Sequence, residues 1–191
     1  MLELKVRVLS IWVVTSSLLV SSPLYLTAFA ASQGNGVVLL EGQIIDSACA
    51  LETGSDYQLI EMDPVPLGRL IREGDGDPHP FSLRLVNCSL TRPDPDRPGQ
   101  NLPDWQHLRV TFEGLSDRDG RSFAAEGSSE GVALHITDLQ GHESTPGVPM
   151  PMMPSAGQDQ ALHYIVQLVG NERPMAVGAH RAAVRFRLEY Y

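Results

Sequence analysis

The spacing of chain-breaking residues after residue 30 constrains the fold more than any other feature of this sequence. Glycine, proline, aspartate and asparagine interrupt the chain roughly every 8 to 12 residues, which is typical of all-β domains. Between the breaks, apolar and polar residues alternate, as in Leu108, Val110 and Phe112, so that each strand has one apolar face. The pattern predicts an all-β sandwich or barrel with few, short helices.

Eight segments have the composition or the alternation expected of strands. They are residues 37–40, 42–50, 57–63, 81–88, 107–113, 132–138, 161–169 and 182–190. The stretch at residues 92–104 instead holds five charged residues and four prolines. We expect it to be a solvated loop without regular structure.

The first thirty residues have the features of a signal peptide. Lys5 and Arg7 precede an apolar run over residues 8–19, and Ala28-Phe29-Ala30 offers small residues for cleavage. The alternative is an N-terminal membrane anchor, but serine and threonine interrupt the run before it reaches the roughly 20 residues of a membrane span. The formal net charge of −9 argues against a nucleic-acid partner, because no positive field attracts phosphate.

Two cysteines, Cys49 and Cys88, both follow the predicted signal peptide. In an exported protein the compartment is oxidising, so a pair of cysteines forms a disulfide and keeps it. We predict a Cys49–Cys88 disulfide, and the alternative is two free buried thiols.

The last ten residues form the most regular strand pattern. Val184, Phe186, Leu188 and Tyr190 share one apolar face, and charged residues lie between them. One interpretation is an ordinary edge strand of the sheet. The other is a strand that pairs with a strand from another protein through backbone hydrogen bonds.

Four features occur in the order found in one known family. These are residues 36–42 (GVVLLEG), residues 46–49 (DSAC), residues 83–88 (LRLVNC) with the second cysteine, and the terminal alternating strand with its penultimate tyrosine. Together they make the chain resemble the chaperone–usher pilins of type 1 and P pili over nearly all of its sequence after the predicted signal peptide.

The resemblance implies an incomplete immunoglobulin-like β-sandwich that lacks its final strand and is completed by a donor strand. A periplasmic chaperone first lends that strand, and an outer-membrane usher then catalyses its replacement by the N-terminal extension of the neighbouring pilin subunit. The extension would be residues 31–41, with Gly36, Val38 and Leu40 on the inserted face, and the pilin domain residues 42–191. The alternative is that residues 37–40 are the first strand of the chain's own sandwich.

For the terminal strand, the resemblance implies that the chaperone pairs with it through Val184, Phe186, Leu188 and Tyr190 and anchors the carboxylate of Tyr191. The protein is then exported to the periplasm and ends in the pilus at the cell surface.

A narrower resemblance concerns the role within the pilus. Residues 60–63, 81–85, 109–114, 147–151 and 161–164 look most like the rod-terminating minor subunit of P pili, in which the groove is blocked and assembly stops. The predicted extension is shorter than in that subunit. A major rod pilin and a carbohydrate-binding adhesin sandwich are the alternatives, although an adhesin usually carries a further domain.

The sequence predicts no catalytic residues, no metal site, no cofactor and no small-molecule substrate. Its six histidines are scattered singly, without the short spacing of zinc ligands. Met150, Met152 and Met153 have sulfur atoms that suit Cu(I), but the surrounding prolines favour a loop laid over the core. An enzyme would need a clustered nucleophile and base, and the sequence has no such motif.

Overall fold

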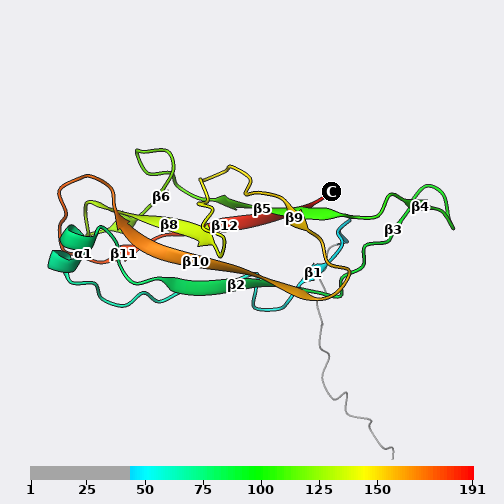
Figure 1. Cartoon of the computed structure of the whole chain (residues 1–191), viewed down its shortest axis with the longest axis horizontal. Helices are drawn as coiled ribbons and strands as arrows, with labels where there is room; N and C mark the ends of the chain where they lie inside the picture. The colour runs from blue at the N-terminus through cyan, green and yellow to red at the C-terminus, as the bar shows by residue number, and fades with distance from the viewer. Residues whose placement is uncertain (1–43) are drawn as a thin grey trace, which may run out of the picture. The chain divides into compact units, whose positions relative to one another are not determined.

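The alternating segments of the sequence form two antiparallel sheets that face each other. The computed structural model describes residues 44–191, and Figure 1 shows the arrangement of their strands. In spatial order, the first sheet consists of β1 (Ala50–Leu51), β2 (His79–Val86), β10 (Gln160–Gly170), β8 (Val132–Asp138) and β6 (Phe123–Ala124). The second consists of β12 (Arg185–Tyr190), β5 (His107–Glu113) and β9 (Met153–Pro154).

Two small strand pairs and one helix complete the described elements. β3 (Arg92–Pro93) pairs with β4 (Asn101–Leu102), and β7 (Glu126–Gly127) pairs with β11 (His180–Arg181). The helix α1 (Leu67–Glu73) lies at the same end of the domain as β11, whereas the β3–β4 hairpin projects from the other end (Figure 1). The nearly all-β architecture predicted from the alternation is confirmed.

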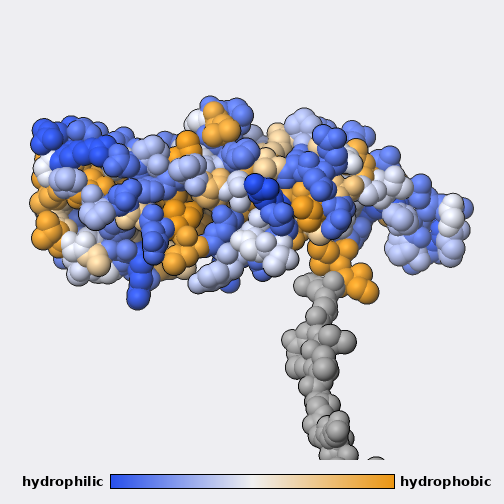
Figure 2. Space-filling model, turned by 90° about the horizontal axis from the view of Figure 1, so that it is seen from below, coloured by the Kyte–Doolittle hydropathy of each residue, from blue (hydrophilic) through white to orange (hydrophobic). Residues whose placement is uncertain are grey.

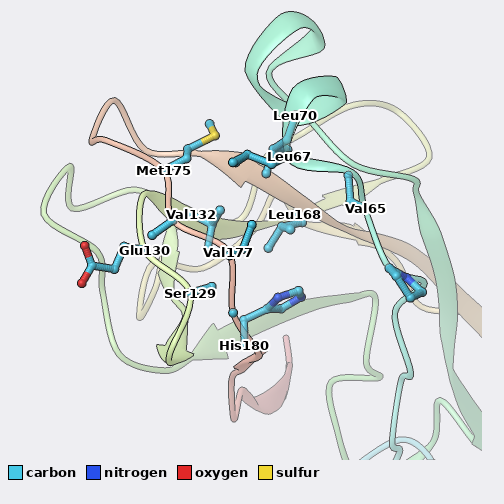
Figure 3. A pocket seen from close by; sticks show the side chains of 13 residues that line it. Val65, Leu67, Leu70, Ser129, Glu130, Val132, Leu168, Met175, Val177 and His180 are labelled. Carbon is cyan, nitrogen blue, oxygen red and sulfur yellow. The ribbon is translucent and has the colours of Figure 1, made fainter.

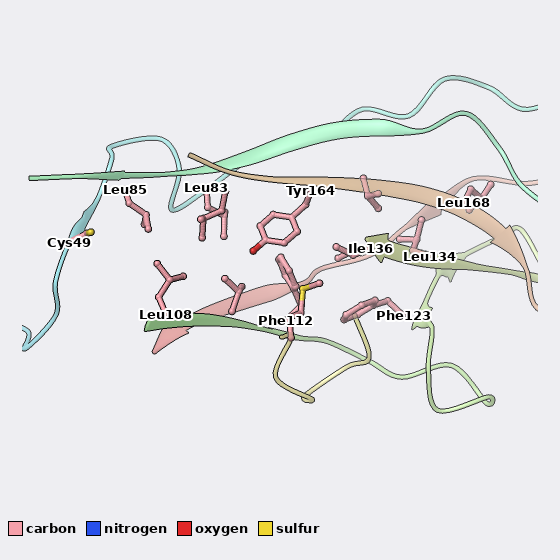
Figure 4. Close-up of a cluster of buried hydrophobic side chains, with 14 of the residues drawn as sticks. Cys49, Leu83, Leu85, Leu108, Phe112, Phe123, Leu134, Ile136, Tyr164 and Leu168 are labelled. Atoms are coloured by element: carbon pink, nitrogen blue, oxygen red, sulfur yellow. The ribbon is translucent and has the colours of Figure 1, made fainter. Parts of the chain in front are cut away.

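The core lies between the two sheets, where the apolar faces of the long strands meet (Figure 4). Leu83 and Leu85 of β2 oppose Leu108 and Phe112 of β5, and all four are at most 2% exposed. A strand with period-two alternation buries one face in this way, because successive side chains point to opposite sides of the sheet. Phe112 packs edge-on against Tyr164 of β10, with ring centroids 4.9 Å apart.

The predicted strands differ in how well the structure matches them. Those at residues 81–88, 107–113, 132–138, 161–169 and 182–190 correspond to β2, β5, β8, β10 and β12. The prediction at residues 42–50 is wrong for residues 44–49, since the first described strand is Ala50–Leu51. Residues 57–63 are not a strand either, because they form no ladder with a described neighbour.

The segment at residues 92–104 contains the β3–β4 hairpin, so the prediction of a loop without regular structure is wrong there. Two residue pairs join its strands, Arg92 with Leu102 and Pro93 with Asn101. Asp94 closes the turn, because its Oδ2 accepts a hydrogen bond from Arg97 Nε at 2.7 Å. Proline is tolerated here because the hairpin lies outside the two main sheets.

Tyr164 offers a test of how the core is packed. Its hydroxyl is buried and has no hydrogen-bond partner among the described residues, and burial together with the Asp138 carboxylate raises its pKa. Tyr164→Phe removes this unsatisfied group and keeps the ring, so we expect stability to increase by about 1 kcal/mol. Urea unfolding at fixed protein concentration measures the change. Tyr57→Phe, at a site 82% exposed, is the matched control, and a loss of stability in Tyr164→Phe would contradict the packing argument.

Candidate functional site

β12 borders the core but has a strand neighbour on only one edge within residues 44–191. It pairs antiparallel with β5, with Phe186 opposite Phe112 and Leu188 opposite Val110. The side chains of Val184, Phe186, Leu188 and Tyr190 pack against the core, yet each stays partly exposed. An edge strand with a half-buried apolar face is a template for a further strand.

A second wall of half-buried apolar residues comes from the segment before α1. Ile60, Met62 and Val65 pack against the same core. The backbone of residues 56–65 forms no hydrogen bond with the backbone of any described residue. A side chain holds this segment to the sheet, because Gln58 Nε2 donates to Ser82 O at 2.9 Å.

We call the seven residues of these two walls the open seam: Ile60, Met62, Val65, Val184, Phe186, Leu188 and Tyr190. Figure 2 views the domain from the side on which β2 lies in Figure 1, and apolar surface interrupts the hydrophilic surface in several places. The open seam exposes both apolar side chains and unpaired strand backbone, which is what an incomplete sandwich offers to a partner.

An apolar pocket of about 180 Å³ lies at the α1 end of the open seam. In Figure 3, Leu67 and Leu70 of α1 lie on one side of the pocket and His180 on the other. Val65 contributes to its lining, so the pocket touches one wall of the seam, and His180 belongs to the segment that leads into β12.

α1 is short but well defined at both ends. Pro66 precedes it with an extended backbone, and Gly74 follows with φ 88°, a left-handed conformation that glycine adopts without steric cost. The N–H of Gly74 donates to Leu70 O at 2.9 Å, and Leu70 is buried. These ends place Leu70 in the pocket lining.

Close backbone contacts build the opposite wall of the pocket. A Cβ added at Gly178 would lie 2.3 Å from the carbonyl carbon of Ser128, and one at Gly131 would lie 2.7 Å from Pro174 O. Residues 127–131 and 173–180 therefore pack backbone against backbone, where no side chain fits.

The chain end is held firmly at the other end of the open seam. A Tyr191 oxygen accepts hydrogen bonds from the N–H groups of Gln106 (2.7 Å) and His107 (3.0 Å), and the Tyr191 N–H donates to His107 O. The Arg109 guanidinium lies 4.7 Å from the centre of the Tyr191 ring. Burial raises the pKa of Tyr190, the last residue of the seam.

No protein-family model matches the sequence. A minor pilin protein of the PAP fimbriae of Escherichia coli is 31% identical over 156 residues, which cover 82% of this chain and 77% of that protein. The chain belongs to the chaperone–usher pilin family. This pilin is therefore a structural fimbrial subunit and not an enzyme, and its place is the pilus at the cell surface.

More distant pilins and a solved structure agree with this assignment. A probable major fimbrial subunit of Escherichia coli O157:H7 is 27% identical, with 86% of this chain and 88% of that protein covered. A chain from the structure of a chaperone–usher pilus superposes with a TM-score of 0.68 at 20% identity, covering 86% of this chain and all of that one. The fold is the incomplete immunoglobulin-like sandwich of pilin subunits. Within residues 44–191, no helix has the length and apolar character needed to cross a membrane.

The structure tests some of the predicted site residues. The Cys49–Cys88 disulfide is confirmed. Val184, Phe186, Leu188 and Tyr190 lie along one wall of the open seam, and their role stays a prediction. Gly36, Val38 and Leu40 lie outside the described residues, as do the predicted signal peptide and extension.

The second wall of the seam and the pocket beside it have no sequence pattern that predicts them. Ile60 and Met62 belong to the predicted strand at residues 57–63, whose backbone has no described strand partner. Pro66 and Gly74 mark the ends of α1, yet seven residues are too few for helical periodicity to stand out.

Proposed function

We propose that a strand from another protein completes this pilin along the open seam. The observation that carries the proposal is the unpaired edge of β12, whose half-buried apolar side chains pack against the same core as those of Ile60, Met62 and Val65. An inserted strand would bond to the free backbone groups, and its alternate side chains would fill the seam. Each Val or Leu buried in this way contributes about 1.5–3 kcal/mol.

The proposal assigns the first donor strand to a chaperone. A periplasmic chaperone pairs with Val184, Phe186, Leu188 and Tyr190 and binds the carboxylate of Tyr191. In a subunit whose groove is open, an outer-membrane usher would then catalyse exchange with the extension of a neighbouring subunit, and a terminating subunit resists that step. The supporting feature is the C-terminal corner, where hydrogen bonds from Gln106 and His107 hold Tyr191 in a defined position.

As a donor, this pilin supplies residues 31–41 to a neighbour, with Gly36, Val38 and Leu40 on the inserted face. The alternation Gly36, Val38, Leu40 supports this, because it matches the period of a strand that presents one face to a partner. The domain boundaries follow: a signal peptide at residues 1–30, the extension at 31–41 and the pilin domain at 42–191.

Within the pilus, we propose the role of a minor subunit that terminates the rod. Two observations support it. The similarity is higher to a minor pilin, at 31% identity, than to a probable major subunit, at 27%. In addition, α1 lines the pocket at one end of the open seam, which is where a block to an entering strand would lie.

A peptide with the sequence of residues 31–41, added to the chaperone complex, tests both levels of the proposal. We expect the chaperone to stay bound, because a terminator resists exchange, while a chaperone-bound rod subunit in a parallel reaction accepts its peptide. Size-exclusion chromatography measures the released chaperone. Release at the rod-subunit rate would contradict the terminating role, and a mature chain that is a stable monomer without any donor would contradict strand completion itself.

A further inference from the structure

The point at which the N-terminal segment enters the domain is held by three separate contacts. The Arg92 guanidinium binds Asp46 Oδ2 through Nη2 at 2.5 Å and through Nε at 3.1 Å. The N–H of Ser89 donates to Ala48 O at 2.7 Å, and Cys49 is joined to Cys88. Of the three contacts, the one between Arg92 and Asp46 is nearest in sequence to the predicted extension.

Arg92 also connects this entry point to the open seam. Its guanidinium lies 4.3 Å from the centre of the Trp105 ring, and the Trp105 ring lies 6.1 Å from that of Tyr190. Tyr190 is the last residue of the seam, and its hydroxyl is buried without a described partner. An unbroken series of contacts therefore runs from Asp46 through Arg92 and Trp105 to Tyr190.

The chemistry of Arg92 suits a positioning role. A guanidinium is planar, so it can stack on an indole and bind a carboxylate with its edge at the same time, which a lysine ammonium cannot do. The side chain of Arg92 is 31% exposed, whereas that of Asp46 is 63% exposed. An isolated ion pair this exposed would contribute little, so stacking on Trp105 is what holds Arg92 in place for Asp46.

We propose that Arg92 is a positioning residue that holds Asp46, close to the proposed donor segment in the sequence, and that Trp105 links this contact to occupancy of the seam at Tyr190. The inference rests on the proposed function, in which one subunit both accepts a strand and donates one. A strand in the seam covers Tyr190 and limits the motion of the neighbouring Trp105 ring. A less mobile Trp105 ring limits the motion of the Arg92 guanidinium stacked on it, and therefore of Asp46, which Arg92 binds. Filling the seam is thereby coupled to Asp46, from which the chain continues toward the proposed donor segment, and we expect this coupling to speed donation.

The test measures donation and acceptance separately. Mature chains with Arg92→Ala, Arg92→Lys or Arg187→Ala are bound to the chaperone and mixed with a chaperone-bound rod subunit that accepts their extension. Arg187 is the control, because its exposed pair with Glu113 at 3.5 Å lies on the charged face of β12, away from the seam. We expect Arg92→Ala to donate about five-fold more slowly than wild type, Arg92→Lys to recover only part of the rate, and Arg187→Ala to match wild type.

A spectroscopic measurement distinguishes positioning from a general loss of structure. The chain has two tryptophans, and Trp12 lies in the predicted signal peptide, so 5-fluorotryptophan incorporated into the mature chain labels Trp105 alone. We expect its 19F resonance to shift when unlabelled chaperone fills the seam, and this shift to change in Arg92→Ala while chaperone binding stays within about two-fold.

The outcomes that contradict the inference are separable from those that contradict the proposed function. Equal donation by wild type and Arg92→Ala, or a Trp105 resonance that does not respond to the chaperone, overturns the inference alone. A wild-type chain that neither binds the chaperone nor donates its segment overturns the proposed function as well.

Discussion

A chain carrying Leu188→Asp is expected to lose its complex with the chaperone. Leu188 lies in the middle of the seam wall formed by β12, opposite Val110 of β5, and its side chain is half-buried before any partner binds. A partner strand would bury the new carboxylate without a counter-ion, at a cost of roughly 3 kcal/mol or more. We expect affinity to fall at least about a hundred-fold, as measured by titration calorimetry or co-purification.

The neighbouring residue gives the control for this experiment. Arg187 belongs to the same strand but faces the other way, and its pair with Glu113 is largely exposed. Arg187→Ala should leave the complex intact, because such pairs contribute little. Retention of the chaperone by Leu188→Asp, or equal losses in both variants, would show that the apolar face of β12 is not the binding surface.

Loss of the disulfide is expected to have the largest effect on stability. Cys49 and Cys88 are separated by 39 positions, and opening a loop of that length restores conformational freedom to the unfolded chain. The double substitution to alanine should lower the free energy of unfolding by about 4 kcal/mol.

Urea unfolding of chaperone complexes at one fixed concentration measures this loss. Fixed concentrations are needed because a bound partner stabilises the folded state by mass action. Wild type treated with a reductant is the matched control and should resemble the double variant. An unchanged midpoint in both samples would show that the bridge adds nothing to the fold.

Five long strands were predictable because their information is local. Two of them, β5 and β8, have the predicted bounds, His107–Glu113 and Val132–Asp138. In both, every second residue is a large apolar one that is buried in the core, although Thr111 and Ala133 between them are buried as well. Turn residues on either side mark where each strand ends.

Segments that depend on distant partners were not predictable in the same way. In the predicted strand at residues 57–63, Ile60 and Met62 alternate with Glu61 and Asp63, but alternation reports which side chains are buried and not which backbone groups are paired. Ile60 and Met62 do pack against the core, while the backbone beside them has no described strand partner. In the β3–β4 hairpin the backbone is paired although the sequence does not indicate it. Its prolines favour a loop, and the pairing involves only two residues per strand.

The candidate site was predictable in part. The alternation at the end of the sequence predicts the strand β12, and the predicted signal peptide, which implies an oxidising compartment, predicts the Cys49–Cys88 disulfide. The Arg92–Trp105–Tyr190 contacts join residues far apart in the sequence, so no local pattern indicated them.

The hydrogen bonds that fix Tyr191 limit where a label can be attached to this protein. A Tyr191 oxygen accepts hydrogen bonds from the N–H groups of Gln106 and His107. A tag fused to Tyr191 would therefore begin at a residue that is already fixed in place, and it would compete with those bonds. The turn of the β3–β4 hairpin has no such restriction, since residues 95–100 are all exposed. An epitope or fluorophore inserted at that turn would project into solvent and leave the hydrogen bonds of Tyr191 unchanged.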